Sequence, residues 1–270
     1  MSIMQPSYQA DHIVAPPQIE QRNVPTVLAM LFSLLGLGIL WKIVVMLGGY
    51  PDFVLPAPET VVQRLITEAS TGTLLHHTRT TLIEAVSGFG LALIFSLTLG
   101  YVLAHIPRLE RILAPQIAAT QAIPIVAIAP LIILWAGSDI QARILVATLV
   151  TFFPILSSTI VALRGIAREL LEMARISGAS RWQLLTLVEL PLALPGIFGG
   201  VKSGLALATT GAVVGEFVGG RDGLGALINI ARGLFDTPLM FVALVTLAAM
   251  TLSFYALAVV LERILVHFEY

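Results

Sequence analysis

Lys202 stands in the middle of a stretch, residues 190–215, that contains no other charged side chain. An ionisable residue at membrane depth is unfavourable unless it faces protein or a watery cavity. Two interpretations of Lys202 stay open, a counter-charge for an anionic solute and an internal ion pair or helix clamp. Glu216 lies about 21 Å further along a straight helix, so it cannot pair with Lys202 within that helix.

Other residues that could do chemistry are scarce. The chain has no cysteine, and no two of its five histidines have the spacing of a zinc protease. Residues 196–203 nearly spell a phosphate-binding loop, but Val201 stands where a glycine must be. The sequence therefore predicts no catalytic residue, metal ligand or cofactor in this chain, and we expect that it is not an enzyme and does not hydrolyse ATP.

The composition is that of a membrane protein. Of 270 residues, 57% are hydrophobic and only 11% are charged, with a mean hydropathy of +0.93. Soluble domains have about 25% charged residues, so a soluble enzyme and a disordered chain are both disfavoured. The net charge of −1 leaves no basic excess for nucleic-acid binding.

Apolar runs of about 20 residues indicate membrane-spanning helices. We predict an all-α, polytopic membrane protein with one transmembrane domain, residues 23–270, after a disordered cytoplasmic tail, residues 1–22. The six predicted spans are residues 23–47, 80–104, 112–137, 142–163, 191–216 and 238–262. Pro115, Pro124 and Pro130 predict that the third span is broken.

The arginines set the expected orientation, since inner segments are enriched in basic residues. Both termini are predicted to be cytoplasmic, in a bacterial inner membrane. This orientation places eight arginines on the inner side: Arg22, Arg108, Arg111, Arg164, Arg168, Arg175, Arg181 and Arg263. Five fall on the outer side: Arg64, Arg79, Arg143, Arg221 and Arg232. The outer segment 49–78 is expected to hold a short amphipathic helix that starts at Pro58 and stops at Gly72.

Small residues recur every four positions in the fifth span, at Gly196, Gly200 and Gly204. This spacing favours close helix packing, and a direct contact with solute is the alternative. A close seam between two copies of the chain would be a place for a pathway.

The outer end of the fifth span carries Glu216, which is either a gate or docking residue or a solvated interfacial carboxylate. Gly223 and Gly225 follow, and they permit a sharp turn. We interpret this turn as a hinge beside a translocation gate.

The segment between the fourth and fifth spans, residues 164–190, is named the elbow here. Gly178 suits a helix end, and Ser180 with Gln183 reads as a capping box that starts a second short helix. Pro191 is expected to stop that helix and to start the next span. Two short helices at a glycine turn suit docking into a groove on another protein.

Within this region Glu172, Ala174, Gly178, Leu190 and Pro191 resemble the EAA motif of binding-protein-dependent ABC transporter permeases. That motif is EAA, three residues, Gly, nine residues and Ile-x-Leu-Pro, and the spacing fits throughout. Met173 and Val188 depart mildly from it. Further stretches are similar to the nitrate, sulfonate and taurine branch: residues 55–58, 123–124, 129–131, 152–154 and 223–225.

The resemblance implies a type I importer permease fold and a set of partners. These are a second permease copy, two cytoplasmic ATPase subunits that bind ATP and Mg, an extracytoplasmic binding protein, and membrane lipid. The elbow would couple the permease to the ATPases. The resemblance implies a small anion such as a sulfonate, taurine or nitrate as solute, and a vitamin or heterocyclic precursor such as riboflavin or a pyrimidine is the alternative.

Two other classes of function fit less well. An ion-driven secondary transporter is expected to carry carboxylates within its spans or inverted repeats. An intramembrane enzyme needs a nucleophile with a base, or metal ligands, within the spans. Neither pattern stands out in this sequence.

Overall fold

The computed structural model describes residues 26–266, and every regular element among them is helical. The predicted tail, residues 1–22, lies outside the described residues. In chain order the elements are α1 (Thr26–Gly48), α2 (Pro58–Thr71), α3 (Thr73–His105), α4 (Pro107–Ala122), α5 (Ile125–Ala136), α6 (Ile140–Arg164), α7 (Arg168–Ile176), α8 (Arg181–Leu184), the π-helix η1 (Leu185–Glu189), α9 (Leu190–Gly219), α10 (Leu224–Gly233) and α11 (Thr237–Leu265).

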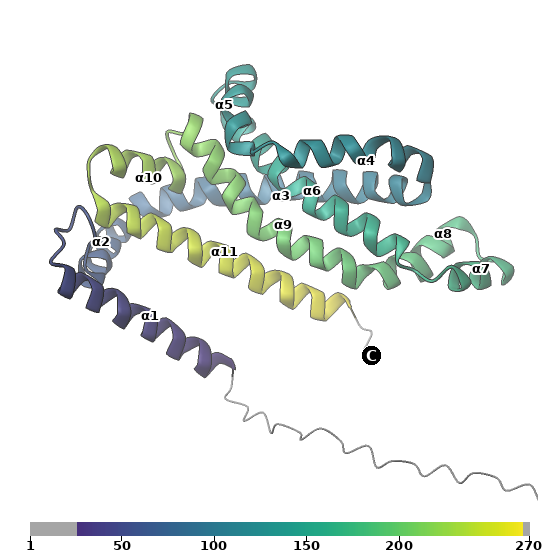
Figure 1. Cartoon of the computed structure of the whole chain (residues 1–270), viewed down its shortest axis with the longest axis horizontal. Helices are drawn as coiled ribbons and strands as arrows, with labels where there is room; N and C mark the ends of the chain where they lie inside the picture. Colours follow the sequence, from purple (N-terminus) through teal and green to yellow (C-terminus); the bar gives the residue numbers. More distant parts are fainter. Residues whose placement is uncertain (1–25, 267–270) are drawn as a thin grey trace, which may run out of the picture.

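Four long helices, α3, α6, α9 and α11, run side by side along the long axis of the molecule (Figure 1). Each of them is long and apolar enough to cross a membrane. The bent pair α4 and α5 makes a fifth candidate span, and α1 contributes a shorter apolar stretch, Leu35–Gly48. The all-α membrane fold is therefore confirmed, whereas the count of six spans is not reached among the described residues.

The tightest contact in the bundle is between α6 and α9. A Cβ atom on Gly200 would lie 2.6 Å from the Cβ of Ser158, and one on Gly204 would lie 2.8 Å from the side chain of Ile155. A Cβ atom on Gly196 would likewise come too close to the side chain of Ala162, which also belongs to α6. The glycine stripe thus packs α9 on α6 within one chain, so the seam that we considered between two copies is an internal one.

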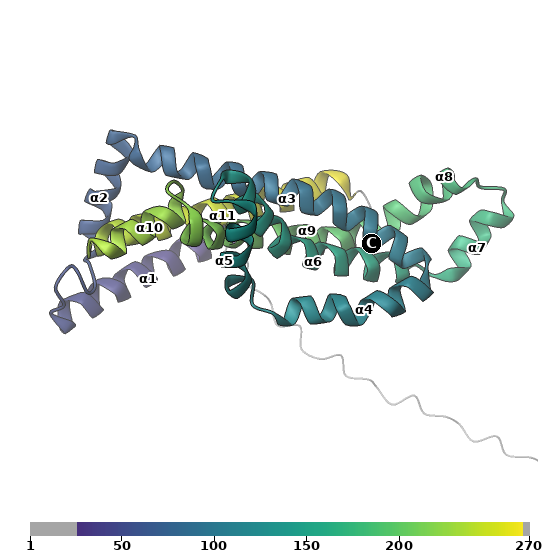
Figure 2. The ribbon, with the colours of Figure 1, turned by 90° about the horizontal axis from the view of Figure 1, so that it is seen from above.

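The third predicted span is broken at residues 123–124, where α4 meets α5 at an angle of 94°. Pro124 precedes the first residue of α5 and keeps an extended backbone there. As a result α5 projects from the bundle, while α4 runs along it (Figures 1 and 2).

Helix α1 diverges from the bundle and is held at one end (Figure 1). Lys42 pairs with Glu59 of α2, and this hydrogen bond lowers the pKa of the Glu59 carboxyl. Trp41 stacks on Phe241 of α11, with ring centroids 5.2 Å apart. As predicted, α2 starts at Pro58 and is stopped at Gly72, which follows its last residue Thr71 and adopts a φ of +80°.

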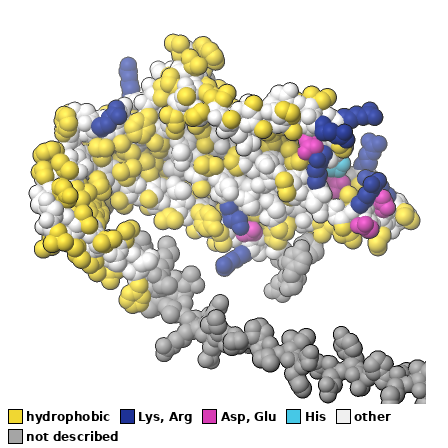
Figure 3. Space-filling model, viewed as in Figure 1, with side chains coloured by type: hydrophobic (Ala, Val, Ile, Leu, Met, Phe, Trp, Pro, Cys, Tyr) yellow, Lys and Arg dark blue, Asp and Glu magenta, His cyan; other side chains and the backbone are white. Residues whose placement is uncertain are grey.

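Charged side chains gather at the end of the molecule that carries α7 and α8, whereas the rest of the visible face is mainly hydrophobic or neutral (Figure 3). We call this end the elbow end, and the end that carries α2 and α10 the loop end. The apolar surface between them suits lipid contact.

Candidate functional site

The elbow projects from the elbow end as two short helices (Figure 1). Gly178 turns the chain after α7 with a φ of +85°, a conformation that glycine adopts without strain. Both bonds of the predicted capping box are present, since the Ser180 hydroxyl accepts from the Gln183 amide and the Gln183 side chain accepts from the Ser180 amide. Local sequence signals therefore shape this segment.

The surface of the elbow combines apolar side chains with exposed charges. Met173 is 65% exposed, Ile176 87% and Trp182 71%. Glu172 is exposed and pairs with Arg168 at 3.1 Å, whereas Ala174 is half-buried. Exposed apolar side chains at the tip of a projecting segment suit a partner surface.

The base of the elbow continues into α9 without a break. The elements α8, η1 and α9 follow one another directly, and Leu190 and Pro191 are the first two residues of α9. The expectation that Pro191 stops the preceding helix is therefore wrong. Pro191 has no amide hydrogen to donate to the carbonyl four residues earlier, Leu187, and a π-turn spans that position. Such π-turns are frequent at functional sites.

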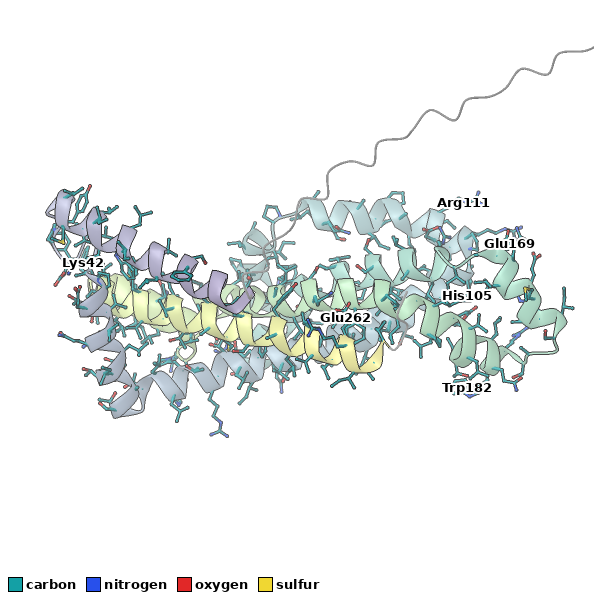
Figure 4. The ribbon with its side chains drawn as sticks, turned by 90° about the horizontal axis from the view of Figure 1, so that it is seen from below. Lys42, His105, Arg111, Glu169, Trp182 and Glu262 are labelled. Atoms are coloured by element: carbon teal, nitrogen blue, oxygen red, sulfur yellow. The ribbon has the colours of Figure 1, made fainter. Side chains whose placement is uncertain are left out.

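A buried carboxylate fastens this base to the bundle, and the sequence analysis missed it. Glu189 is 2% exposed, and its Oε1 lies 3.0 Å from Nε2 of His105, the last residue of α3. The ring of Tyr101 lies against that of His105, with centroids 4.2 Å apart. Figure 4 shows His105 at the foot of the elbow, between Glu169 on one side and Trp182 on the other.

At the loop end a second cluster is buried, which we call the polar lock. It comprises His77, Thr81 and Glu84 of α3, Arg143 of α6, Glu216 of α9 and the backbone of residues 222–225. Glu216 is fully buried and accepts hydrogen bonds from the Thr81 hydroxyl and the Gly225 amide, both at 2.6 Å. It is therefore not a solvated interfacial carboxylate.

The rest of the polar lock joins α3 and α6 to the same loop. Arg143 lies 2.7 Å from the carboxylate of Glu84 and donates to the carbonyl of Asp222 at 2.9 Å. The Gly223 amide donates to Nδ1 of His77 at 3.0 Å, and the Leu224 amide donates to Thr81 at 2.8 Å. The sequence holds a signal for the α3 part, because positions 77, 81 and 84 recur on one helical face.

Gly223 and Gly225 make room for the carboxylate of Glu216. Gly223 has a φ of +112°, and a Cβ atom there would overlap the Glu216 carboxyl group. A Cβ on Gly225 would lie 2.8 Å from Oε2 of Glu216. These two glycines thus allow a close approach to Glu216 as well as a sharp turn.

Lys202 pairs with Glu262 of α11, and its Nζ lies 3.0 and 2.9 Å from the two carboxylate oxygens. Both side chains are 25% exposed, and Figure 4 shows Glu262 on α11 along the flank of the bundle. The charge of Lys202 is therefore balanced within the chain. Within residues 26–266, His, Asp and Glu side chains form no group that could hold a metal ion.

Comparisons with known proteins agree with this architecture. Residues 92–267 match the family described as binding-protein-dependent transport system inner membrane component. The chain is 62% identical over 237 residues to the riboflavin transport system permease protein RibX of Chloroflexus aurantiacus, covering 88% of each chain.

More distant relatives carry other names. The formylaminopyrimidine transport permease protein ThiX of Halalkalibacterium halodurans is 32% identical over 84% of this chain and 90% of that one. The putative aliphatic sulfonates transport permease protein SsuC of Escherichia coli is 33% identical over 86% of this chain and 89% of that one. In fold, the chain is similar to a chain of the MetNI methionine ABC transporter in an inward-facing conformation, with a TM-score of 0.66, 22% identity, and coverage of 73% of this chain and 98% of that one.

Proposed function

Because the chain belongs to the family of binding-protein-dependent transport system inner membrane components, we propose that it is the subunit through which an ABC importer moves riboflavin or a closely related heterocycle. The chain is a multi-pass ABC importer permease, and the ATPase of such a system is a separate subunit. The membership sets aside the ion-driven transporter and the intramembrane enzyme.

The proposed solute is the alternative from the sequence analysis and not its main expectation, which was a small anion. One observation favours this choice: identity to a riboflavin permease is 62%, against 33% to a sulfonate permease. The internal pairing of Lys202 with Glu262 supports it, because the lysine charge is already compensated. An aminopyrimidine is the second candidate, since a formylaminopyrimidine permease is also a relative.

The working arrangement that we propose is a dimer of this chain with two ATPase subunits and an extracytoplasmic binding protein, in a bacterial inner membrane. The elbow faces the cytoplasm and docks into a cleft of each ATPase. The exposed side chains of Met173, Ile176 and Trp182 support this role. ATP closes the ATPase pair and moves the elbows, and the permease pair opens on one side as it closes on the other.

The orientation follows from the elbow. With the elbow in the cytoplasm, both termini are cytoplasmic and the polar lock lies at the outer side. There the binding protein delivers solute, and Glu216, Gly223 and Gly225 hold the loop that it meets.

Uptake in cells tests the choice of solute. A bacterium that cannot make riboflavin and lacks its own transporter would express this chain with its ATPase and binding protein. We expect labelled riboflavin to accumulate, and excess unlabelled riboflavin to block it while taurine and nitrate do not. Accumulation that taurine or nitrate blocks would contradict the proposal, and accumulation that only an aminopyrimidine blocks would favour the second candidate.

A further inference from the structure

Two prolines that lie far apart in the sequence line one open crevice on the surface of the chain. Pro124 stands at the break between α4 and α5, and Pro154 lies inside α6. Both line a crevice of about 270 Å³, which we call the proline crevice. Its lining residues are Thr120, Gln121, Ile123, Pro124, Ile125, Leu149, Val150, Phe153 and Pro154.

Two backbone acceptors at this crevice lack the donor of a regular α-helix. Pro154, inside α6, has no amide hydrogen to donate to the carbonyl of Val150. Thr120 lies in the last turn of α4, where carbonyls have no partner within the helix, and both residues line the crevice. Irregular backbone at membrane depth is tolerated where it is buried in protein or lines a cavity, and broken helices of transporters often form solute sites.

The depth of the crevice suits a solute on its way through the membrane. Val150 and Pro154 lie about halfway along α6, which is a candidate span of 25 residues. The crevice volume is close to the lower end of ligand pockets, about 300 Å³. It is large enough for a ring system that leaves its side chain outside.

The side chains of the crevice add one flat surface and one amide. Phe153 is half-buried and packs edge-on against Phe152, with ring centroids 5.1 Å apart. Gln121 is exposed at the crevice and carries both a donor and an acceptor. The residues that line it carry no charge, so nothing here compensates the charge of an anion.

We infer that the proline crevice binds the ring of a neutral heteroaromatic solute during translocation. The ring lies against Phe153, its single N–H donates to the carbonyl of Thr120 or Val150, and the side-chain amide of Gln121 donates to a ring carbonyl. This inference rests on the proposed function and names the part of the permease that holds the solute. Isoalloxazine, the ring of riboflavin, has the required flat face, N–H donor and carbonyl acceptors.

Substitutions at the crevice test the inference against matched controls. Phe153→Leu and Gln121→Leu remove the flat face and the amide. Phe95→Leu is the control for the first, because Phe95 is 58% exposed on α3. Gln116→Leu is the control for the second, because Gln116 is exposed on the same helix as Gln121 but does not line the crevice.

The measurement is equilibrium binding of radiolabelled riboflavin to the purified permease–ATPase complex without binding protein, together with uptake by proteoliposomes that contain the whole transporter. We expect each crevice variant to bind about five to ten times more weakly than the wild type and to take up riboflavin more slowly. Both controls should behave as the wild type in riboflavin binding, in uptake and in basal ATPase activity.

Two results would overturn the crevice and leave the proposed function standing. One is riboflavin binding by the crevice variants that equals that of their controls. The other is riboflavin uptake by the wild-type transporter with no binding to the permease–ATPase complex at saturating concentration. If the wild-type transporter takes up no riboflavin at all, the proposed function fails and the crevice inference fails with it.

Discussion

The imidazole of His105 lies 3.0 Å from the carboxylate of Glu189 and so fastens the end of α3 to the base of the elbow. Near the other end of α3, the Thr81 hydroxyl donates to Glu216 at 2.6 Å. Glu189 directly precedes α9 and Glu216 lies near its end. The unbroken, proline-free helix α3 is therefore joined to the α9 segment close to both ends, and we expect the two helices to move together when the elbow moves.

Removing the contact between His105 and Glu189 should weaken both folding and coupling. Glu189→Ala deletes a buried hydrogen-bonded carboxylate, which we expect to lower the free energy of unfolding by about 1–3 kcal/mol. In a double-mutant cycle with His105→Ala the two effects should be less than additive. The exposed pair Arg168 and Glu172 serves as control, with an expected effect of about 0.3–0.5 kcal/mol. Additive losses at positions 105 and 189 would show that the two side chains do not act together.

The turn at Gly178 should be essential for coupling. Gly178→Pro forces φ from +85° to about −65°, and Glu172→Lys reverses the charge on the adjacent α7. We expect both variants to insert into the membrane but to lose the ATPase activity that the binding protein stimulates. Gly199→Ala is the control, since a Cβ atom there meets nothing within 4 Å. Normal stimulated hydrolysis in either elbow variant would reject the coupling role.

The polar lock should be sensitive to one added carbon atom. Gly225→Ala places a Cβ atom 2.8 Å from Glu216 Oε2 and should displace the carboxylate from the Gly225 amide. Gly223→Ala adds backbone strain to a similar overlap. Both should slow transport at least severalfold, whereas Gly233→Ala, at the end of α10 in open space, should not. Unchanged transport with alanine at both positions 223 and 225 would rule out a gating role for this turn.

Substitutions at Lys202 distinguish a structural role of its charge from a direct contact with the solute. Lys202→Met leaves Glu262 unpaired and should lower the melting temperature, and a second change, Glu262→Gln, should restore most of that loss, since a neutral partner needs no counter-charge. The double variant should also transport riboflavin at a rate close to the wild type. A double variant that is stable but inactive would indicate that Lys202 contacts the solute.

The elbow could be predicted because its signals are local. The bonds between Ser180 and Gln183 span three residues. Gly178 was expected to end a helix because of its residue type alone. The start of α2 at Pro58 and its end at Gly72 were predictable for the same reason.

The sequence places the α3 residues of the polar lock on one helical face, but it does not show which residues they pair with. The central bond of the polar lock joins Thr81 and Glu216, which are 135 positions apart, and nothing in the local pattern pairs them. Glu84 and Arg143 fall near the outer ends of the predicted spans 80–104 and 142–163, but no local pattern pairs them. In the structure the two side chains lie 2.7 Å apart inside the bundle.

The most direct test of the central claim is riboflavin uptake by proteoliposomes that contain this chain and its ATPase, with the binding protein on the outside and ATP on the inside. We predict that riboflavin accumulates against its gradient only when ATP and binding protein are both present, and that an ion gradient alone drives none. Uptake that proceeds without ATP, or ATP-driven uptake of taurine or nitrate in place of riboflavin, would contradict the account.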